Sequence, residues 1–254
     1  MIHRLDWRAR ARAAGVHLLI SAGVAALAAA LVFGLWYPGV YRHLSGGRDL
    51  FILVTAVDVV LGPLLTLAVF DLRKGWPHLR RDLAVIGAIQ LAALVYGLHT
   101  VYVARPVAMV FEVDRLRVVT AADVHRPELP DAAPEYRSLP LTGPWLLSTR
   151  KPAAGDERNA ALFMALRGLD ISLRPKFWQP YDRGRSAVME RARPLGDLLK
   201  RYPDQAAQFI TEVSQHGLEP SRAHFLPVTA RGDWVAVLDD EGGIITFLPA
   251  EGFF

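Results

Sequence analysis

Three long apolar stretches in the first 103 residues constrain the fold more than any other feature of this sequence. They cover residues 17–37, 50–70 and 83–103 and interrupt a chain that is otherwise rich in charged side chains. An α-helix of about 21 residues rises 1.5 Å per residue and crosses a hydrocarbon core of about 30 Å. We therefore predict a three-helix transmembrane region over residues 17–103, between a basic N-terminus (residues 1–16) and a separate domain (residues 104–254).

The distribution of basic residues predicts which side of the membrane each segment occupies. Residues 1–103 contain ten Lys/Arg and five Asp/Glu, whereas residues 104–254 contain nineteen and twenty. Four arginines precede the first stretch and four basic residues fill the loop before the third, but only Arg42 and Arg48 lie in the first loop. Because positive charge favours the cytoplasmic side, we expect a bacterial inner-membrane protein with a cytoplasmic N-terminus and a periplasmic domain.

Composition also argues against a cleaved signal peptide, nucleic-acid binding and cysteine-based sites. A cleaved signal peptide would have a basic start and a run of small residues such as Ala25 to Ala30, but the apolar run here continues to Trp36 and exceeds a signal core. The sequence pI of about 9.6 does not indicate nucleic-acid binding, because the domain after the helices is nearly neutral. The absence of cysteine excludes disulfides and thiolate metal sites.

Asp58 is an acidic residue deep within the second apolar stretch. A carboxylate at that depth is costly and rare, so it indicates either a functional group or a protonated side chain that bonds a neighbouring helix. Counting 1.5 Å per residue places Asp58 and Tyr96 at similar depths, about 18 and 20 Å from the cytoplasmic side, which makes Tyr96 a candidate partner. Gly62 would allow close helix approach, and Pro63 predicts a kink.

Gln90 and His99 are the remaining polar candidates in the third stretch. Their position favours a packing or interface role over a functional site, although Gln90 stays among the candidate site residues.

The pattern after residue 104 predicts an α+β domain with an antiparallel sheet. Apolar, β-rich runs cover residues 107–113, 117–120, 145–148, 223–229, 234–239 and 244–248, and the last two are joined by a hairpin turn. Helical patterns cover residues 157–167, 194–201 and 203–216. We expect a sheet built from both ends of the domain, with the helices between them.

No catalytic motif is present in the sequence. It lacks a Gly-rich phosphate loop, a Gly-x-Ser-x-Gly elbow and histidine pairs at zinc-binding spacing. His125, His216 and His224 are isolated, and the acidic run at residues 239–241 is typical of a solvated turn. We therefore predict no catalytic residue, no metal site and no cofactor.

Several linked motifs give the chain a family resemblance. They are Asp58-Val-Val-Leu-Gly62-Pro63, Gln90-Leu-Ala-Ala-Leu-Val-Tyr96-Gly97, Arg105-Pro106 and Asp114-Arg115. In order and spacing they resemble the type IV pilin accessory proteins of the TfpX/TfpZ type, most clearly over about residues 15–125. The resemblance adds Arg105, Pro106, Asp114 and Arg115 to the candidate site, as residues close to the membrane on its periplasmic side.

The resemblance implies a role in type IV pilus biogenesis, as a membrane chaperone or assembly factor for a cognate major pilin. The implied partners are the membrane helix and head domain of that pilin, the lipid bilayer and the pilus assembly machinery. One hypothesis is that Asp58 meets the N-terminal amine of the pilin or shields a nearby glutamate, which requires a pilin lifted toward the growing filament. The alternatives are a membrane enzyme that modifies pilin or a lipid-linked donor, with Asp58 or the Asp114-Arg115 pair at its site, and a membrane sensor.

Overall fold

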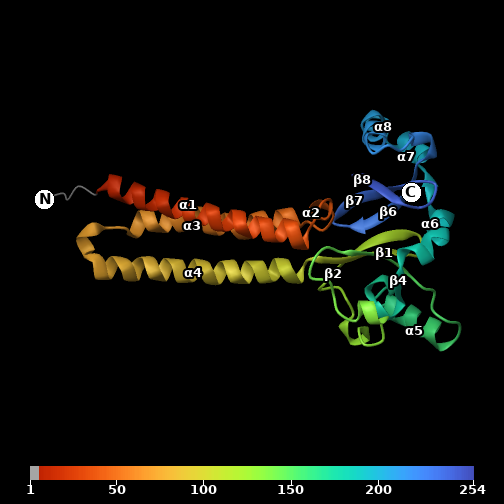
Figure 1. Ribbon diagram of the computed structural model, residues 1–254, viewed down its shortest axis with the longest axis horizontal. Coiled ribbons are helices and arrows are strands. Elements are labelled where there is room, and N and C mark those ends of the chain that lie inside the picture. Colours follow the sequence, from red (N-terminus) through yellow and green to blue (C-terminus); the bar gives the residue numbers. More distant parts are fainter. Residues whose placement is uncertain (1–5) are drawn as a thin grey trace.

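A computed structural model describes residues 6–254 and shows a long helical bundle attached to a sheet domain (Figure 1). The bundle consists of α1 (Trp7–Leu31), α3 (Gly47–Val69) and α4 (Trp76–Val103). α1 continues into a π-helical turn, η1 (Val32–Trp36), and a short helix, α2 (Tyr41–Leu44), precedes α3. By length and composition, all three long helices could cross a membrane, which confirms the three predicted helical segments.

The helices extend beyond the apolar stretches from which they were predicted. α1 begins ten residues before the first stretch, where the Asp6 carboxylate caps the helix by accepting a hydrogen bond of 3.1 Å from the backbone N–H of Ala9. α4 begins at Trp76, with Pro77 in its first turn. Helix ends are set by caps and backbone hydrogen bonds, whereas hydrophobicity marks only the segment suited to lipid.

The sheet domain contains eight strands. They are β1 (Pro106–Glu112), β2 (Arg115–Thr120), β3 (Trp145–Thr149), β4 (Trp178–Pro180), β5 (Arg193–Pro194), β6 (His224–Ala230), β7 (Gly232–Leu238) and β8 (Ile244–Leu248). Their order in the sheet is β4-β3-β1-β2-β6-β7-β8. The short strand β5 stands outside this order and pairs with β6. The predicted hairpin β7–β8 is confirmed as an antiparallel pair, and β1 and β2 form a second antiparallel hairpin.

The sheet is mixed, so the predicted antiparallel pairing is correct for most neighbouring strands but not for all of them. β1 pairs with β3 in parallel and β2 pairs with β6 in parallel. In both cases a long connection brings the chain back to the end of the sheet where the earlier strand began, which a parallel pair requires. The alternation of apolar residues marks a strand but carries no information about the direction of its neighbour.

The helices of this domain come between β3 and β6 in the chain and lie around the outside of the sheet (Figure 1). They are α5 (Asp156–Ala165), α6 (Arg185–Arg191), α7 (Leu195–Arg201) and α8 (Ala206–Gln215), with short 3-10 turns between them. α5, α7 and α8 match the three predicted helices, whereas α6 was not predicted from the sequence. α6 has only seven residues, too few for a clear helical period.

Apolar side chains cover both faces of the sheet. Met109 and Phe111 of β1 belong to one buried cluster, and Ala108 and Val110 belong to a second cluster on the opposite face. Leu44 of α2 is fully buried in the first cluster, and its carbonyl accepts a hydrogen bond of 2.7 Å from the Arg231 N–H. The helical bundle is therefore tied into the core of the sheet domain.

A buried ion pair joins the long loop after β2 to the turn before β4. The Arg174 side chain is only 2% exposed, and its guanidinium donates to both oxygens of Glu128 at 2.6–3.1 Å. Burial alone would raise the pKa of Glu128, but hydrogen bonds and charges from Arg174 and Lys176 outweigh it and hold that pKa below its ordinary value. The pair therefore makes part of the domain's stability dependent on pH.

Candidate functional site

The bundle is built around α3, which packs against both α1 and α4, whereas α1 and α4 scarcely touch each other along their length. Glycines bring α3 and α4 close together at two points. A Cβ added at Gly62 would lie 2.1 Å from Gln90 Nε2, and one added at Gly97 would lie 2.1 Å from Val54 Cγ1. Both distances are far below van der Waals contact. At Gly97 the contact is with a valine fixed close to its backbone, which favours glycine, whereas at Gly62 the amide end of the flexible Gln90 side chain would have to move.

Because α1 and α4 do not meet, a groove remains between them with α3 as its floor. We call it the interhelical groove and define it by the residues that line it, namely His17, Ile20, Ser21, Val24, Ala25, Thr55, Asp58, Gly87, Gln90, Leu91 and Leu94. The groove has a volume of about 200 Å³ and is open on one side. This is larger than the cavity of about 150 Å³ that accommodates a benzene molecule in an engineered protein core, so it could accept a large side chain.

Asp58 supplies the acidic group of the interhelical groove. Within residues 6–254, no hydrogen bond or ion pair to its carboxylate is present. Gln90 Nε2 contacts the Asp58 backbone instead and donates a hydrogen bond of 3.0 Å to its carbonyl. The Thr55 hydroxyl is likewise occupied, because it donates to the Phe51 carbonyl at 2.9 Å. The carboxylate therefore remains available to a group from outside the chain.

The structure brings together three of the intramembrane candidates and separates a fourth. Asp58, Gly62 and Gln90 meet where α3 crosses α4, and α3 continues through Pro63 to Val69. The predicted pairing of Asp58 with Tyr96 is wrong, because Tyr96 is 75% exposed and lines a different surface hollow on α4. Depth arithmetic compares heights along the helices and does not show which face of α4 turns toward α3.

His17 and Ser21 also line the groove but were not identified from the sequence as candidates. His17 Nδ1 lies 2.6 Å from Thr66 Oγ1, and this contact links α1 to α3. The two residues are four apart in an otherwise apolar helix, so they share one face. That spacing is the signal that could have revealed them.

The four candidates expected near the membrane lie at opposite ends of the sheet. Arg105 is 4% exposed and donates to the carbonyls of Tyr102 and Pro140, so it fixes the junction between α4 and the domain, where Pro106 begins β1. Asp114 and Arg115, paired at 2.7 Å, lie at the tip of the β1–β2 hairpin. β1 has seven residues and spans about 23 Å, so the expectation of a juxtamembrane position for Asp114 and Arg115 is wrong.

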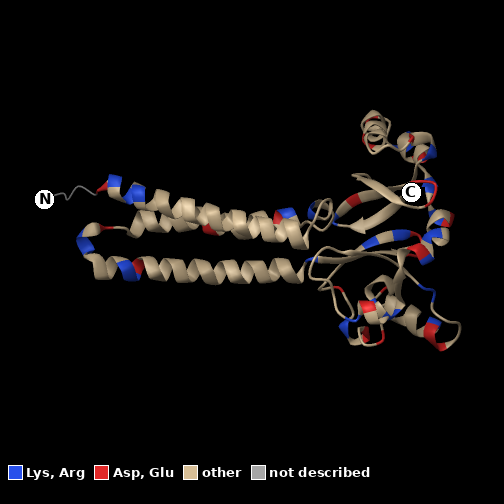
Figure 2. Cartoon of the chain, in the orientation of Figure 1, with Lys and Arg blue, Asp and Glu red and all other residues tan. Residues whose placement is uncertain are grey.

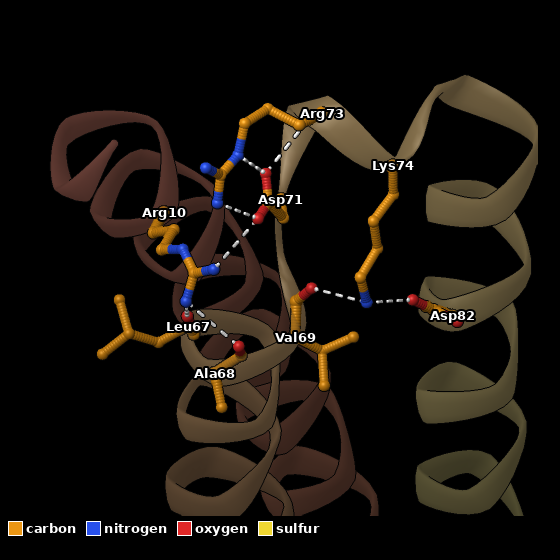
Figure 3. Close-up of polar contacts among 8 residues, drawn as sticks. All are labelled: Arg10, Leu67, Ala68, Val69, Asp71, Arg73, Lys74 and Asp82. Carbon is orange, nitrogen blue, oxygen red and sulfur yellow. Dashed lines mark hydrogen bonds and ion pairs between the residues drawn. The ribbon is translucent and has the colours of Figure 1, made fainter. Parts of the chain in front are cut away.

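The end of the bundle farthest from the sheet carries a network of polar contacts (Figure 3). Arg10 donates to the Leu67 and Ala68 carbonyls at the end of α3 and lies 3.5 Å from the Asp71 carboxylate. Hydrogen bonds from Arg73 lower the pKa of Asp71. Lys74 bonds Asp82 at 2.9 Å and so links the loop to α4. This network holds the three helices together at their basic end.

Comparison with known proteins places the chain among proteins of fimbrial assembly. Residues 5–46 match the family model described as fimbrial assembly protein FimB. The chain is 36% identical over 246 residues to the fimbrial assembly protein of serogroup I from Dichelobacter nodosus, and the match covers 96% of each chain. The chain belongs to the fimbrial assembly protein family.

Other members of this family give the same result. The serogroup E1 fimbrial assembly protein of Dichelobacter nodosus is 34% identical, again over 96% of each chain. The fimbrial assembly protein of serogroups C1 and C2 is 43% identical over 122 residues, which cover 48% of this chain and 93% of that protein. No solved structure matches the chain. The family relation confirms the resemblance to pilus accessory proteins, and this fimbrial assembly protein accordingly has a role in fimbrial assembly.

Proposed function

We propose that this fimbrial assembly protein spans the bacterial inner membrane three times, with its N-terminus in the cytoplasm and its sheet domain in the periplasm. Only 17%, 22% and 17% of the most apolar windows of the three helices is buried within the chain, so lipid or a partner would cover the remaining surface. Charged side chains gather at the two ends of the bundle (Figure 2). The excess of Lys and Arg at the end farthest from the sheet supports a cytoplasmic location for that end.

Within this topology, we propose that the protein is a chaperone or assembly factor that holds the membrane helix of a cognate major pilin against the interhelical groove. The open groove with its unpartnered Asp58 carboxylate is the observation that carries the proposal. An exposed carboxylate in hydrocarbon is costly and favours a partner that supplies a hydrogen-bond donor or positive charge. Small residues, here Ser21, Ala25 and Gly87, are typical of surfaces against which another helix packs.

The position of Asp58 along α3 defines how a pilin would have to lie. Asp58 is eleven residues before the end of α3 at Val69, which corresponds to about 16 Å along the helix. A pilin amine at the cytoplasmic face would therefore not reach the carboxylate. The amine can contact Asp58 only in a pilin that has already been lifted by several helical turns, as during extraction toward a filament.

Site-specific crosslinking tests the proposed contact directly. Because the chain has no cysteine, each introduced cysteine is unique. We expect Ser21→Cys, Asp58→Cys and Gly87→Cys to form disulfides with cysteines placed along the pilin helix in piliated cells. Gly23→Cys on α1 and Ile89→Cys on α4 are matched controls for Ser21→Cys and Gly87→Cys. Both control residues are exposed but do not line the groove. Equal crosslinking from the control positions, or none from the groove in piliated cells, would contradict the proposal.

Filling the groove tests whether the contact matters for function. No atom lies within 4 Å of a Cβ added at Gly87 or at Gly23, so leucine at either position should leave the fold intact. Gly87→Leu should lower pilin abundance and piliation, because its side chain occupies the groove, whereas Gly23→Leu should behave like the wild type. Normal piliation of a Gly87→Leu strain with wild-type amounts of the protein would refute a role for the groove.

The proposal includes no chemical reaction. The mass of native pilin tests this point against the rival function of an enzyme that modifies pilin. We expect an unchanged pilin mass in a deletion strain together with loss of pilin or pili. A mass shift that disappears on deletion would instead favour the enzyme. Contacts of the sheet domain with the pilin head or the assembly machinery are a further part of the proposal and require separate crosslinking.

A further inference from the structure

A second groove lies nearer to the basic end of the bundle. We call it the basal groove, and it is an open hollow of about 570 Å³ between α1, α3 and the start of α4. Its walls are mostly apolar, and Arg12 is the charged residue that lines it. The apolar lining includes Ala13, Val16, Phe70, Leu72 and Leu83. The groove thus combines a long apolar surface with one positive charge.

The charges around the basal groove do not balance. The carboxylates of Asp71 and Asp82 are occupied by Arg10, Arg73 and Lys74 (Figure 3). Four further arginines are exposed and make no ion pair or hydrogen bond with any of residues 6–254, and the first five residues of the sequence contain no carboxylate. These four are Arg8, Arg12, Arg80 and Arg81. This end of the bundle therefore has a surplus of positive charge that an external anion could neutralise.

We propose that the basal groove binds one anionic glycerophospholipid, with an acyl chain along its apolar walls and the phosphate at Arg12. Such a lipid has both parts that the groove requires, an apolar chain and an adjacent negative charge, and basic pockets between membrane helices commonly hold anionic headgroups. The lipid requires the helices to lie in a bilayer but does not require a pilin. The inference therefore goes beyond the proposed function, and either can fail without the other.

Native mass spectrometry of the full-length protein in a neutral detergent tests this site. We expect one phosphatidylglycerol to stay bound at concentrations at which phosphatidylcholine does not. Arg12→Gln should weaken phosphatidylglycerol binding by about fivefold, as expected for one basic residue near a lipid headgroup. Ala13→Leu should weaken binding too, because its side chain fills the groove. Ala13 does not line the interhelical groove, so this variant leaves the proposed pilin contact untouched.

Two matched variants separate this site from a general effect of charge or size. Arg48→Gln removes an exposed arginine at the other end of the bundle that pairs with none of residues 6–254. Ala11→Leu enlarges an exposed residue of α1 outside the groove. Both should bind phosphatidylglycerol as the wild type does. Equal binding of the two lipids by the wild type would overturn the proposal, as would an equal loss of binding in Arg48→Gln and Arg12→Gln.

Discussion

The glycines of α4 allow a sharp test of how the bundle is packed, because the same substitution should have opposite effects at two positions. At Gly97 an added Cβ would lie 2.1 Å from Val54 Cγ1 and 3.2 Å from both Val54 Cβ and Cγ2. Rotating the valine side chain cannot move its Cβ, so α3 and α4 would have to separate. Overpacking of this kind costs about 1–3 kcal/mol, and we expect Gly97→Ala to destabilise the bundle by about that amount.

At Gly87 the same change meets open space, since no atom lies within 4 Å of the added Cβ. Alanine is favoured over glycine in a helix by up to about 1 kcal/mol, so Gly87→Ala should leave stability unchanged or raise it slightly. The two variants should therefore differ by about 1–4 kcal/mol. The difference isolates packing, because helix, residue types and volume change are the same.

Reversible unfolding in mixed detergent micelles containing increasing SDS would measure this difference in unfolding free energy. Energy transfer between labels on cysteines introduced near the ends of α3 and α4 reports their separation, and the absence of native cysteine makes the labelling specific. Val54→Ala provides the rescue, because in that background Gly97→Ala should lose most of its penalty, with a coupling energy of about 1–3 kcal/mol. An unchanged midpoint for Gly97→Ala, or an equal loss in Gly87→Ala, would refute the packing described here.

Three further predictions concern the sheet domain. Glu128→Gln leaves the buried Arg174 guanidinium without its counterion and should lower the free energy of urea unfolding by about 3–5 kcal/mol. The pKa of Glu128 is lowered from 4.5 in the folded protein, so the wild type should lose this stabilisation as pH falls below 4.5. The difference in stability between wild type and variant should shrink over the same pH range. Val113 has φ 53° at a hairpin tip and is 68% exposed, so Val113→Gly should raise the unfolding free energy by about 1 kcal/mol, and a loss of stability would contradict the inferred strain. Burial raises the pKa of Tyr181 to about 12, and its hydroxyl donates to the Gly242 carbonyl at 2.8 Å. Tyr181→Phe should therefore cost about 1 kcal/mol, measured by the thermal midpoint, with no change in its pH dependence between pH 6 and 9.

The sequence predicted the elements of this fold well and their mutual arrangement less well. Apolar length identifies α1, α3 and α4, and alternation identifies most strands, because both signals are local. The parallel pairing of β1 with β3 and of β2 with β6 depends on where long connections return the chain, so no local pattern encodes it. α6 and the two-residue strand β5 are too short to carry a period.

In the candidate site, the sequence likewise indicates where a residue lies along its helix but not which face of the helix it occupies. Asp58 stands out from its composition alone, but its surroundings depend on which way each helix faces. At 100° per residue, Gln90 and Gly97 differ by seven residues and share nearly one face of α4, and both contact α3. Tyr96 is turned by about 100° from Gly97 and points elsewhere. Rise along the axis alone therefore does not identify partners.

The positions of the glycines explain why the bundle has an open groove at all. Gly62 and Gly97 draw α4 onto α3, and Gly47 lies against the Tyr37 ring where α1 gives way to α2. Gly15, Gly23 and Gly87 have no neighbour within 4 Å of an added Cβ, so no comparable contact draws α4 onto α1. A closed three-helix bundle would bury the Asp58 carboxylate without a partner, at a cost that hydrocarbon makes severe. In an open groove the carboxylate can meet a hydrogen-bond donor or a positive charge from another molecule, which supports the proposed partner helix over a purely structural role for Asp58.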